Sequence, residues 1–286
     1  MQTRRQFIKH SGLLSMAPLV SNQVWANDTV KPLSIGACDW SIGKSSDPAA
    51  FEVAKQIGLK GIMVNIGNVA NDLHLRKKEV QQKFLQASRD TGVEISSIAL
   101  AELNQVPYKS DPRTIEWVRD SIDIAKALGA PVVLLAFFEN NDLRNDNTGK
   151  DEVIRRLKEV MPRAEQMGVT LGIESYLNAQ EHIEIIDKVG SDHLKVYYDF
   201  RNTADAGYDT IGEFKKLGKH RICELHIKEN GFLLGKGTLN WKQVFEAIKE
   251  IGYTGDGWAQ IEGAIPDGAA MLPSYKHNLA YLQSLL

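Results

Sequence analysis

Four residues able to bind a metal ion each follow an apolar run in the second half of the chain. They are Glu174, Asp199, His226 and Glu262, spaced 25, 27 and 36 residues apart. If the fold gathers them, three carboxylates repel one another and their pKa values rise unless a cation lies between them. Oxygen-rich ligation with one imidazole suits Mn²⁺ or Mg²⁺, with Co²⁺ or Zn²⁺ as alternatives, and is too poor in nitrogen and sulfur for a structural zinc site. We therefore predict one bound divalent metal ion, with Mn²⁺ favoured.

Each of the four residues also has an ordinary explanation. A glutamate at a strand end often caps a helix or pairs with a cation. Asp199 would serve equally as a cap for the loop at Arg201 and Asn202, and His226 as a core histidine bonded to a backbone carbonyl. Four separate ordinary explanations would not be expected to place such residues at the ends of four successive apolar runs. This coincidence favours the metal site.

One of these apolar runs carries three polar side chains on a single face. Strand alternation places Glu224, His226 and Lys228 on one side, and Leu225 and Ile227 on the other. Buried polar groups need partners. We predict that His226 binds the metal and that Lys228, further out, contacts an oxygen of the substrate or intermediate. Glu224 is expected deeper in the fold, where it requires a cationic partner.

Short β-branched runs alternate with longer helical patterns from residue 33 to the C-terminus. The predicted strands are 33–38, 61–66, 93–100, 131–137, 169–174, 194–199, 222–227 and 257–262. The predicted helices are 48–58, 76–90, 111–129, 150–167, 180–188, 212–218, 240–251 and 269–284. Eight βα units in about 250 residues have the count and size of a single α/β domain folded as a (β/α)8 barrel (TIM barrel). An open doubly wound sheet is the alternative, but no G-x-G-x-x-G motif follows the first strand.

The first 26 residues have the pattern of an export signal. Arg4 and Arg5 precede an apolar run at 12–20, which is shorter than the ~20 residues that a membrane span requires. The paired arginines followed by Gln-Phe-Ile-Lys resemble a twin-arginine signal. We expect cleavage after Ala26, a catalytic domain over 27–286 and a periplasmic location. A basic leader retained in the cytoplasm is the alternative.

Charge and cysteine usage limit the partners and the covalent structure. The net charge is −2, and loss of the leader with its three basic residues would change it to −5. No basic stripe interleaved with aromatic residues is present, so no nucleic acid partner is expected. Cys38 and Cys223 would lie on the first and seventh strands, roughly 10 Å apart in a closed barrel. A disulfide needs a Cα separation of about 7 Å or less, so two free, buried thiols are predicted.

The motifs around the four residues resemble those of a known family. They read Ile-Glu174, Tyr-Asp199, Leu-His226-Ile-Lys228 and Ile-Glu262, with Leu234-Gly-Lys-Gly237 and Trp241 after the histidine. This order resembles the xylose-isomerase-like barrels, which include sugar (phosphate) isomerases and epimerases and, more distantly, endonuclease-IV-like enzymes. The resemblance covers essentially all of residues 27–286 and is specific for the superfamily more than for a substrate.

The resemblance implies a divalent metal bound by Glu174, Asp199, His226 and Glu262, and a sugar bound to it through adjacent oxygens. A bound cation acts as a Lewis acid and stabilises the enediolate that forms when a proton α to a carbonyl is removed. A carboxylate near the metal serves as the base. We expect Glu174 and Glu262 to form the acid–base pair, with Lys228 holding a substrate oxygen.

Three positions depart from the pattern of the ketose epimerases. Those enzymes usually carry a histidine three residues after the metal aspartate, a glutamate six after the first metal glutamate and an arginine six after the metal histidine. Here these positions hold Asn202, Gln180 and Phe232. The oxygen-binding apparatus for a free ketose is therefore not reproduced. His182 is expected on a helix surface, and only His226 ends a strand, so the multi-zinc site of the DNA-repair relatives cannot be assembled.

Further candidate substrate contacts fall at other strand ends. We predict that Trp40, Glu102, Phe137 and Asn202 contact the substrate, and that Trp40, Phe137 and Phe138 offer an apolar platform for a sugar. The glycine-rich loop at 231–237 holds one lysine and is interpreted as a turn before the next helix rather than as a phosphate cradle. Phosphorylated substrates are therefore disfavoured.

The sequence thus predicts an exported, metal-dependent sugar isomerase or epimerase that removes a proton α to a carbonyl. A lyase that eliminates the C1 substituent of a 3-keto-glycoside by the same enolisation is a close alternative. A metal-dependent sugar-binding protein without turnover is another. The expected partner is a small-molecule sugar or glycoside, while the particular sugar and the oligomeric state stay open.

Overall fold

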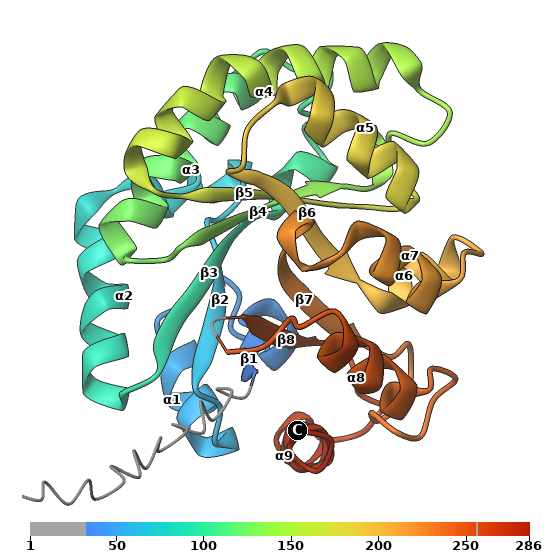
Figure 1. Ribbon diagram of the computed structural model, residues 1–286. Helices are drawn as coiled ribbons and strands as arrows, with labels where there is room; N and C mark the ends of the chain where they lie inside the picture. Colours follow the sequence, from blue (N-terminus) through green and yellow to red (C-terminus); the bar gives the residue numbers. More distant parts are fainter. Residues whose placement is uncertain (1–32, 256) are drawn as a thin grey trace, which may run out of the picture. The chain divides into compact units, whose positions relative to one another are not determined.

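Eight parallel strands close into a barrel in the order of the sequence (Figure 1). The computed structural model describes residues 33–255 and 257–286. The strands are β1 Ser34–Cys38, β2 Gly61–Asn65, β3 Glu94–Leu100, β4 Val132–Phe137, β5 Thr170–Ser175, β6 Leu194–Asp199, β7 Ile222–Lys228 and β8 Trp258–Glu262. Closure is explicit because β1 pairs with both β2 and β8. The prediction of a single (β/α)8 barrel is confirmed.

Helices surround the ring of strands (Figure 1). They are α1 Ala50–Ile57, α2 Lys78–Thr91, α3 Arg113–Leu128, α4 Asn147–Met167, α5 Ala179–Val189, α6 Phe200–Asp205, α7 Thr210–Leu217, α8 Trp241–Glu250 and α9 Met271–Gln283. Short 3-10 turns add η1 Trp40–Ile42, η2 Val69–Asn71, η3 His74–Arg76, η4 Ala101–Asn104, η5 Glu139–Asn141 and η6 Lys219–Arg221. Gly92 and Gly129 end α2 and α3 in the left-handed conformation. The sequence prediction missed α6.

The barrel has two apolar layers because its strands are buried on both faces. Outward-facing side chains pack beneath the helices in a large cluster that includes Val133, Leu135 and Phe137 of β4. The alternate residues Leu134 and Ala136 point into the barrel, where they join a smaller cluster. This parity along β4 decides which residues near its end can reach the mouth of the barrel.

Glu224 lies inside the barrel, below the mouth, and is almost fully buried. Its Oε2 accepts hydrogen bonds from the Ser97 hydroxyl at 2.9 Å, the Tyr197 hydroxyl at 2.9 Å and Gln260 Nε2 at 3.2 Å. Burial, which these donors only partly offset, raises the pKa of Glu224 to about 7. The depth was predicted. The side-chain hydrogen-bond donors to Glu224 in the described residues are neutral, and the expected positive charge comes from His226, which lowers the pKa of Glu224 without a hydrogen bond to it.

Three further predictions concern the cysteines, the membrane and the leader. Cys38 and Cys223 are both free, as predicted, but only Cys38 is buried, since Cys223 keeps part of its surface exposed. Within residues 33–255 and 257–286, no helix is long and apolar enough to cross a bilayer. The predicted signal at 1–26 lies outside the described residues.

Candidate metal centre

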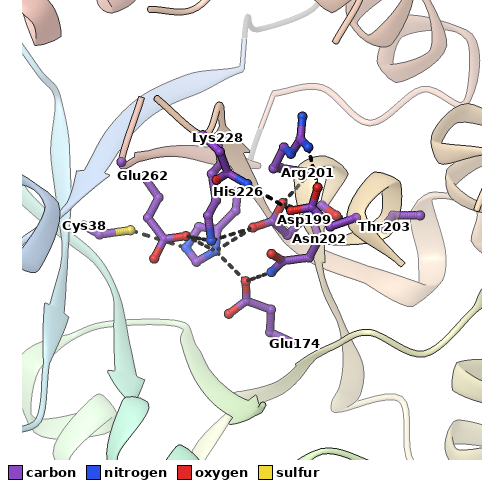
Figure 2. A network of polar contacts seen from close by, with 12 residues as sticks. Cys38, Glu174, Asp199, Arg201, Asn202, Thr203, His226, Lys228 and Glu262 are labelled. Atoms are coloured by element: carbon purple, nitrogen blue, oxygen red, sulfur yellow. Dashed lines mark hydrogen bonds and ion pairs between the residues drawn. The ribbon is translucent and has the colours of Figure 1, made fainter. Parts of the chain in front are cut away.

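The last residues of β5 to β8 bring the four predicted ligands together. Each offers one ligand atom, and these atoms all lie within 4.8 Å of one another. Strand register produces this meeting, because Asp199 is aligned with His226 across β6 and β7. Figure 2 shows the three carboxylates pointing toward the His226 ring from different strands. The chain therefore contains a buried candidate metal site built from Glu174, Asp199, His226 and Glu262.

The imidazole of His226 is fully buried and presents one nitrogen to the carboxylates. Its Nδ1 is 2.8 Å from Glu174 Oε1, 3.6 Å from Glu262 Oε2 and 3.9 Å from Asp199 Oδ2. On the other side, Nε2 lies 3.3 Å from the sulfur of Cys38. Burial alone would lower the pKa of His226, but the surrounding carboxylates, Glu174 first, raise it well above its ordinary value. Nδ1 is thus the nitrogen available to a metal.

Asp199 uses its two carboxylate oxygens differently. Oδ1 caps α6 by accepting hydrogen bonds from the backbone N–H groups of Arg201 at 2.7 Å and Asn202 at 2.9 Å. Oδ2 is buried and has no hydrogen-bond partner among the described residues. Burial raises the pKa of Asp199 to about 7. The capping role and a ligand role are therefore compatible, and the unpartnered Oδ2 fits a cation that would pair with it.

Glu262 is held at both oxygens. Trp40 Nε1 donates to Oε1 at 2.8 Å, and Lys228 Nζ lies 3.2 Å from Oε2. Burial opposes the charged form of Glu262, yet His226 and Lys228 together lower its pKa. Burial likewise opposes the charge of Lys228, and the carboxylates of Glu262 and Asp199 raise its pKa. Glu262 is therefore ionised and fixed in direction, as a ligand or base requires.

A pocket of about 490 Å³ opens above the candidate metal site. Four residues that the sequence predicted as ligands, proton carriers or substrate contacts line it next to the candidate metal site: Glu174, Asn202, Lys228 and Glu262. Trp40 lines it from the first strand's loop, as predicted for a substrate contact. Asn202 is buried and its Nδ2 donates to Glu174 Oε1 at 3.2 Å. Two candidate acid–base carboxylates and one cation thus face the same cavity.

Two predicted substrate contacts are corrected by the structure. Phe137 is fully buried, packs beside Tyr108 with ring centroids 6.5 Å apart, and does not line the pocket. Its parity on β4 turns it outward, and the next residue, Phe138, lines the pocket in its place. Glu102 lies in η4 and accepts a hydrogen bond from the Val69 N–H at 3.2 Å. It is absent from the pocket lining, because the 3-10 turn directs it toward the loop after β2.

His182 was expected on a helix surface and is instead buried. Its Nε2 lies 2.9 Å from the Ser175 hydroxyl, and its Nδ1 is 3.1 Å from the Asn178 carbonyl. Burial lowers the pKa of His182 to about 4. The sequence held a signal for this, since His182 lies three residues before the buried Ile185 on the apolar face of α5.

The loop after β7 is built around a buried carboxylate. Glu229 is fully buried, and its Oε1 accepts from the Leu239 N–H at 3.0 Å and from Trp241 Nε1 at 3.1 Å. A Cβ at Gly237 would overlap the carboxylate of Glu229, so a larger residue there would displace that carboxylate. An anion-binding loop would not enclose a carboxylate. The interpretation of 231–237 as a turn before the next helix agrees with this arrangement.

Phe138 and four residues that the sequence prediction missed form the far side of the pocket. Asn104, Phe138, Asp142, Arg144 and Tyr176 line it from the loops that follow β3, β4 and β5. The available signal was position alone, because each lies within a few residues of a strand end. Nothing in their types marked them out from other loop residues.

Comparison with known proteins identifies the family and supplies relatives. The chain is 30% identical over 128 residues to a D-psicose 3-epimerase of Enterocloster bolteae, an alignment covering 42% of this chain and 41% of that protein. It is 26% identical over 221 residues to a probable endonuclease 4 of Bacillus licheniformis, covering 69% of this chain and 73% of that protein.

Two solved structures share the fold at low sequence identity. A D-psicose 3-epimerase from Clostridium cellulolyticum H10, crystallised with D-tagatose, superposes with a TM-score of 0.74 at 18% identity, covering 89% of this chain and 99% of that one. A 3-keto-D-glucoside 4-epimerase from E. coli gives 0.69 at 15% identity, covering 88% and 99%. The family model described as xylose isomerase-like TIM barrel matches residues 51–285. The chain belongs to the xylose isomerase-like TIM barrel family.

Proposed function

We propose that this chain is a divalent-metal-dependent enzyme that removes a proton next to a carbonyl group in a sugar or sugar derivative. Isomerisation or epimerisation is the first candidate outcome. The observation that carries the proposal is the cluster of Glu174, Asp199, His226 and Glu262, two of which, Glu174 and Glu262, line one pocket. Relatives named as sugar epimerases support the substrate class.

The residues present fit a divalent cation. Glu174, Asp199 and Glu262 would supply oxygens and His226 would supply Nδ1, while the unpartnered Oδ2 of Asp199 leaves a ligand atom for it. When bound, such a cation supplies Lewis-acid polarisation of a substrate carbonyl. The donor set suits Mn²⁺ first, with Mg²⁺, Co²⁺ or Zn²⁺ as alternatives.

Glu174 and Glu262 are the candidate proton carriers. They come from strands three positions apart in the barrel order, so they approach the pocket from different sides. One carboxylate would take the proton from carbon and the other would return a proton to the opposite face of that carbon, which inverts it. Lys228 would donate a hydrogen bond to the oxygen on which negative charge builds. Trp40 keeps Glu262 aimed into the pocket.

Elimination from a 3-keto-glycoside is the second candidate. It is favoured by two of the three positions that depart from the ketose epimerase pattern: Gln180 is exposed and bonds to Glu184, and Phe232 is 47% exposed. Neither lines the pocket. In this reaction the C2 proton passes to a carboxylate, its electron pair forms a C1–C2 double bond, and the C1–O bond breaks. The departing oxygen takes a proton and leaves as an alcohol.

Solvent exchange tests the proposal. Metal-loaded protein in D₂O is incubated with free ketoses, aldoses and 3-keto-glycosides, and proton NMR follows the signal at the carbon next to the carbonyl. We expect one class to lose that signal with wild-type protein, and Glu262→Gln to stop the loss. Glu250→Gln, an exposed acid paired with Lys215, is the matched control. A sugar-binding protein without turnover would show no exchange, and full activity in Glu262→Gln would refute the assigned base.

Export to the periplasm by the twin-arginine route is proposed from residues 1–26. The support is the Arg4-Arg5 pair and the short apolar run after it. Changing both arginines to lysine should leave the protein in the cytoplasmic fraction. A periplasmic location that survives this change would contradict the proposed route.

A nucleic acid substrate is not proposed, although one relative is named a probable endonuclease. The chain carries a net negative charge, and the part of it that the structure describes holds a single group of potential metal ligands. Affinity for DNA that falls steeply with salt would contradict this view.

A further inference from the structure

The pocket has a second wall that faces the candidate metal site. Phe138 follows β4 and Tyr176 follows β5, and both are half-buried residues of the pocket lining. In the closed order of eight strands, β4 lies opposite β8, which carries Glu262. Phe138 therefore stands across the mouth from Glu262, while Tyr176 lies two residues after Glu174 of β5. None of the proposed proton transfers uses this wall.

The wall is an organised set of contacts. The rings of Phe138 and Tyr176 meet edge to face, with centroids 4.8 Å apart. The guanidinium of Arg144 lies 4.4 Å from the centre of the Tyr176 ring, and its Nε donates to Asp142 Oδ2 at 2.8 Å. Asn104 accepts from the Phe138 N–H at 3.0 Å, which fixes the turn that carries this ring. The two rings are thus held in place before any ligand binds.

The charges of the wall select against an anion. Asp142 neutralises Arg144, and the exposed Glu139 adds a negative charge to the lining. Half-buried aromatic rings bordered by amide and charged groups suit a ring with an apolar face and many hydroxyls. A neutral sugar ring has this chemistry, whereas a phosphate or carboxylate group does not.

We propose that Phe138 and Tyr176, with Arg144 against the Tyr176 ring, form a subsite for a second sugar ring, so that the substrate is a disaccharide or similar glycoside. The inference rests on the proposed function in taking the reacting ring to lie over the candidate metal site, between Glu174 and Glu262. A pocket of about 490 Å³ is within the usual range for ligands larger than one ring. The expected substrates are therefore neutral glycosides whose second ring reaches the wall.

Calorimetric binding of unreactive probes tests this subsite. The probes are methyl β-glucopyranoside with methyl β-cellobioside, and methyl α-glucopyranoside with methyl α-maltoside, titrated into Mn²⁺-loaded protein. We expect at least one disaccharide to bind about tenfold more tightly than its one-ring partner, as one well-placed aromatic contact allows. In Phe138→Ala/Tyr176→Ala this advantage should fall below about threefold. Phe232→Ala, an exposed phenylalanine outside the pocket lining, is the matched control and should keep it.

The result is separable from the test of the proposed function. These glycosides have no carbonyl group next to an exchangeable C–H, so binding is measured without turnover. Equal affinities for one-ring and two-ring probes, or an advantage that survives in the double variant, would overturn the subsite even if proton exchange is observed. Absence of proton exchange would refute the enzymatic role while leaving a measured two-ring preference intact.

Discussion

His182 gives the chain a pH-dependent stability that can be calculated. Burial lowers its pKa from an ordinary value of 6.5 to about 4, so the unfolded chain binds a proton that the folded chain excludes. Because the pKa of His182 is lower in the folded chain, its contribution to the free energy of unfolding is fully present above the unfolded pKa. That contribution is lost as the pH falls toward the folded pKa. Going from about pH 7 to about pH 5 should therefore cost about 2 kcal/mol of unfolding free energy through this one residue.

The variant His182→Gln isolates this contribution. Glutamine cannot be protonated, and urea unfolding of metal-free protein at both pH values should show a pH dependence about 2 kcal/mol smaller than that of the wild type. The other titrating groups are common to both proteins and cancel. His220→Gln, which alters an exposed histidine of η6, is the matched control and should behave as the wild type. Equal pH dependence in His182→Gln and wild type would refute the reasoning.

Three further predictions concern the metal site. Cys38→Ala should weaken Mn²⁺ binding, measured by calorimetry, about tenfold, because it removes the contact that orients His226 Nε2. Cys38→Ser should recover most of the affinity, and unchanged binding in both variants would contradict the orienting role. Trp40→Phe should lower kcat/KM about tenfold by freeing Glu262 Oε1, and a wild-type value would show that the bond is dispensable. Lys228→Met should still bind Mn²⁺ yet exchange substrate protons about a hundredfold more slowly, and loss of the metal instead would assign Lys228 a structural role.

The sequence predicted the barrel and the meeting of the four ligands for one physical reason. Each of the four ends a strand or lies close to its end, and the ends of parallel strands in a closed barrel share one mouth. The positions of Glu174 and Glu262 at strand ends therefore predicted that they lie near each other, although the two are far apart in the chain. Strand alternation similarly placed Glu224 at depth and Lys228 at the rim.

Other features depended on contacts between residues far apart in the chain, which the sequence pattern does not predict. At the end of β4, a choice between Phe137 and Phe138 required the parity of a strand that is apolar on both faces. The partners of Glu224 come from three other strands, so neutral donors could not be distinguished from a cation beforehand. The polar partner of the buried His182 is Ser175, which lies across a loop from it, so this hydrogen bond could not be predicted from the helix pattern.

Metal dependence of proton exchange is the most direct test of the central claim. Protein stripped with EDTA is titrated with Mn²⁺ in D₂O in the presence of a substrate found by the screen, and the exchange rate at the carbon next to the carbonyl is followed by proton NMR. We predict no exchange without metal and a rate that saturates at about one Mn²⁺ per chain. His226→Ala should not reach that rate at the same Mn²⁺ concentration. Exchange that proceeds equally well in the metal-free protein, or in His226→Ala, would contradict the account.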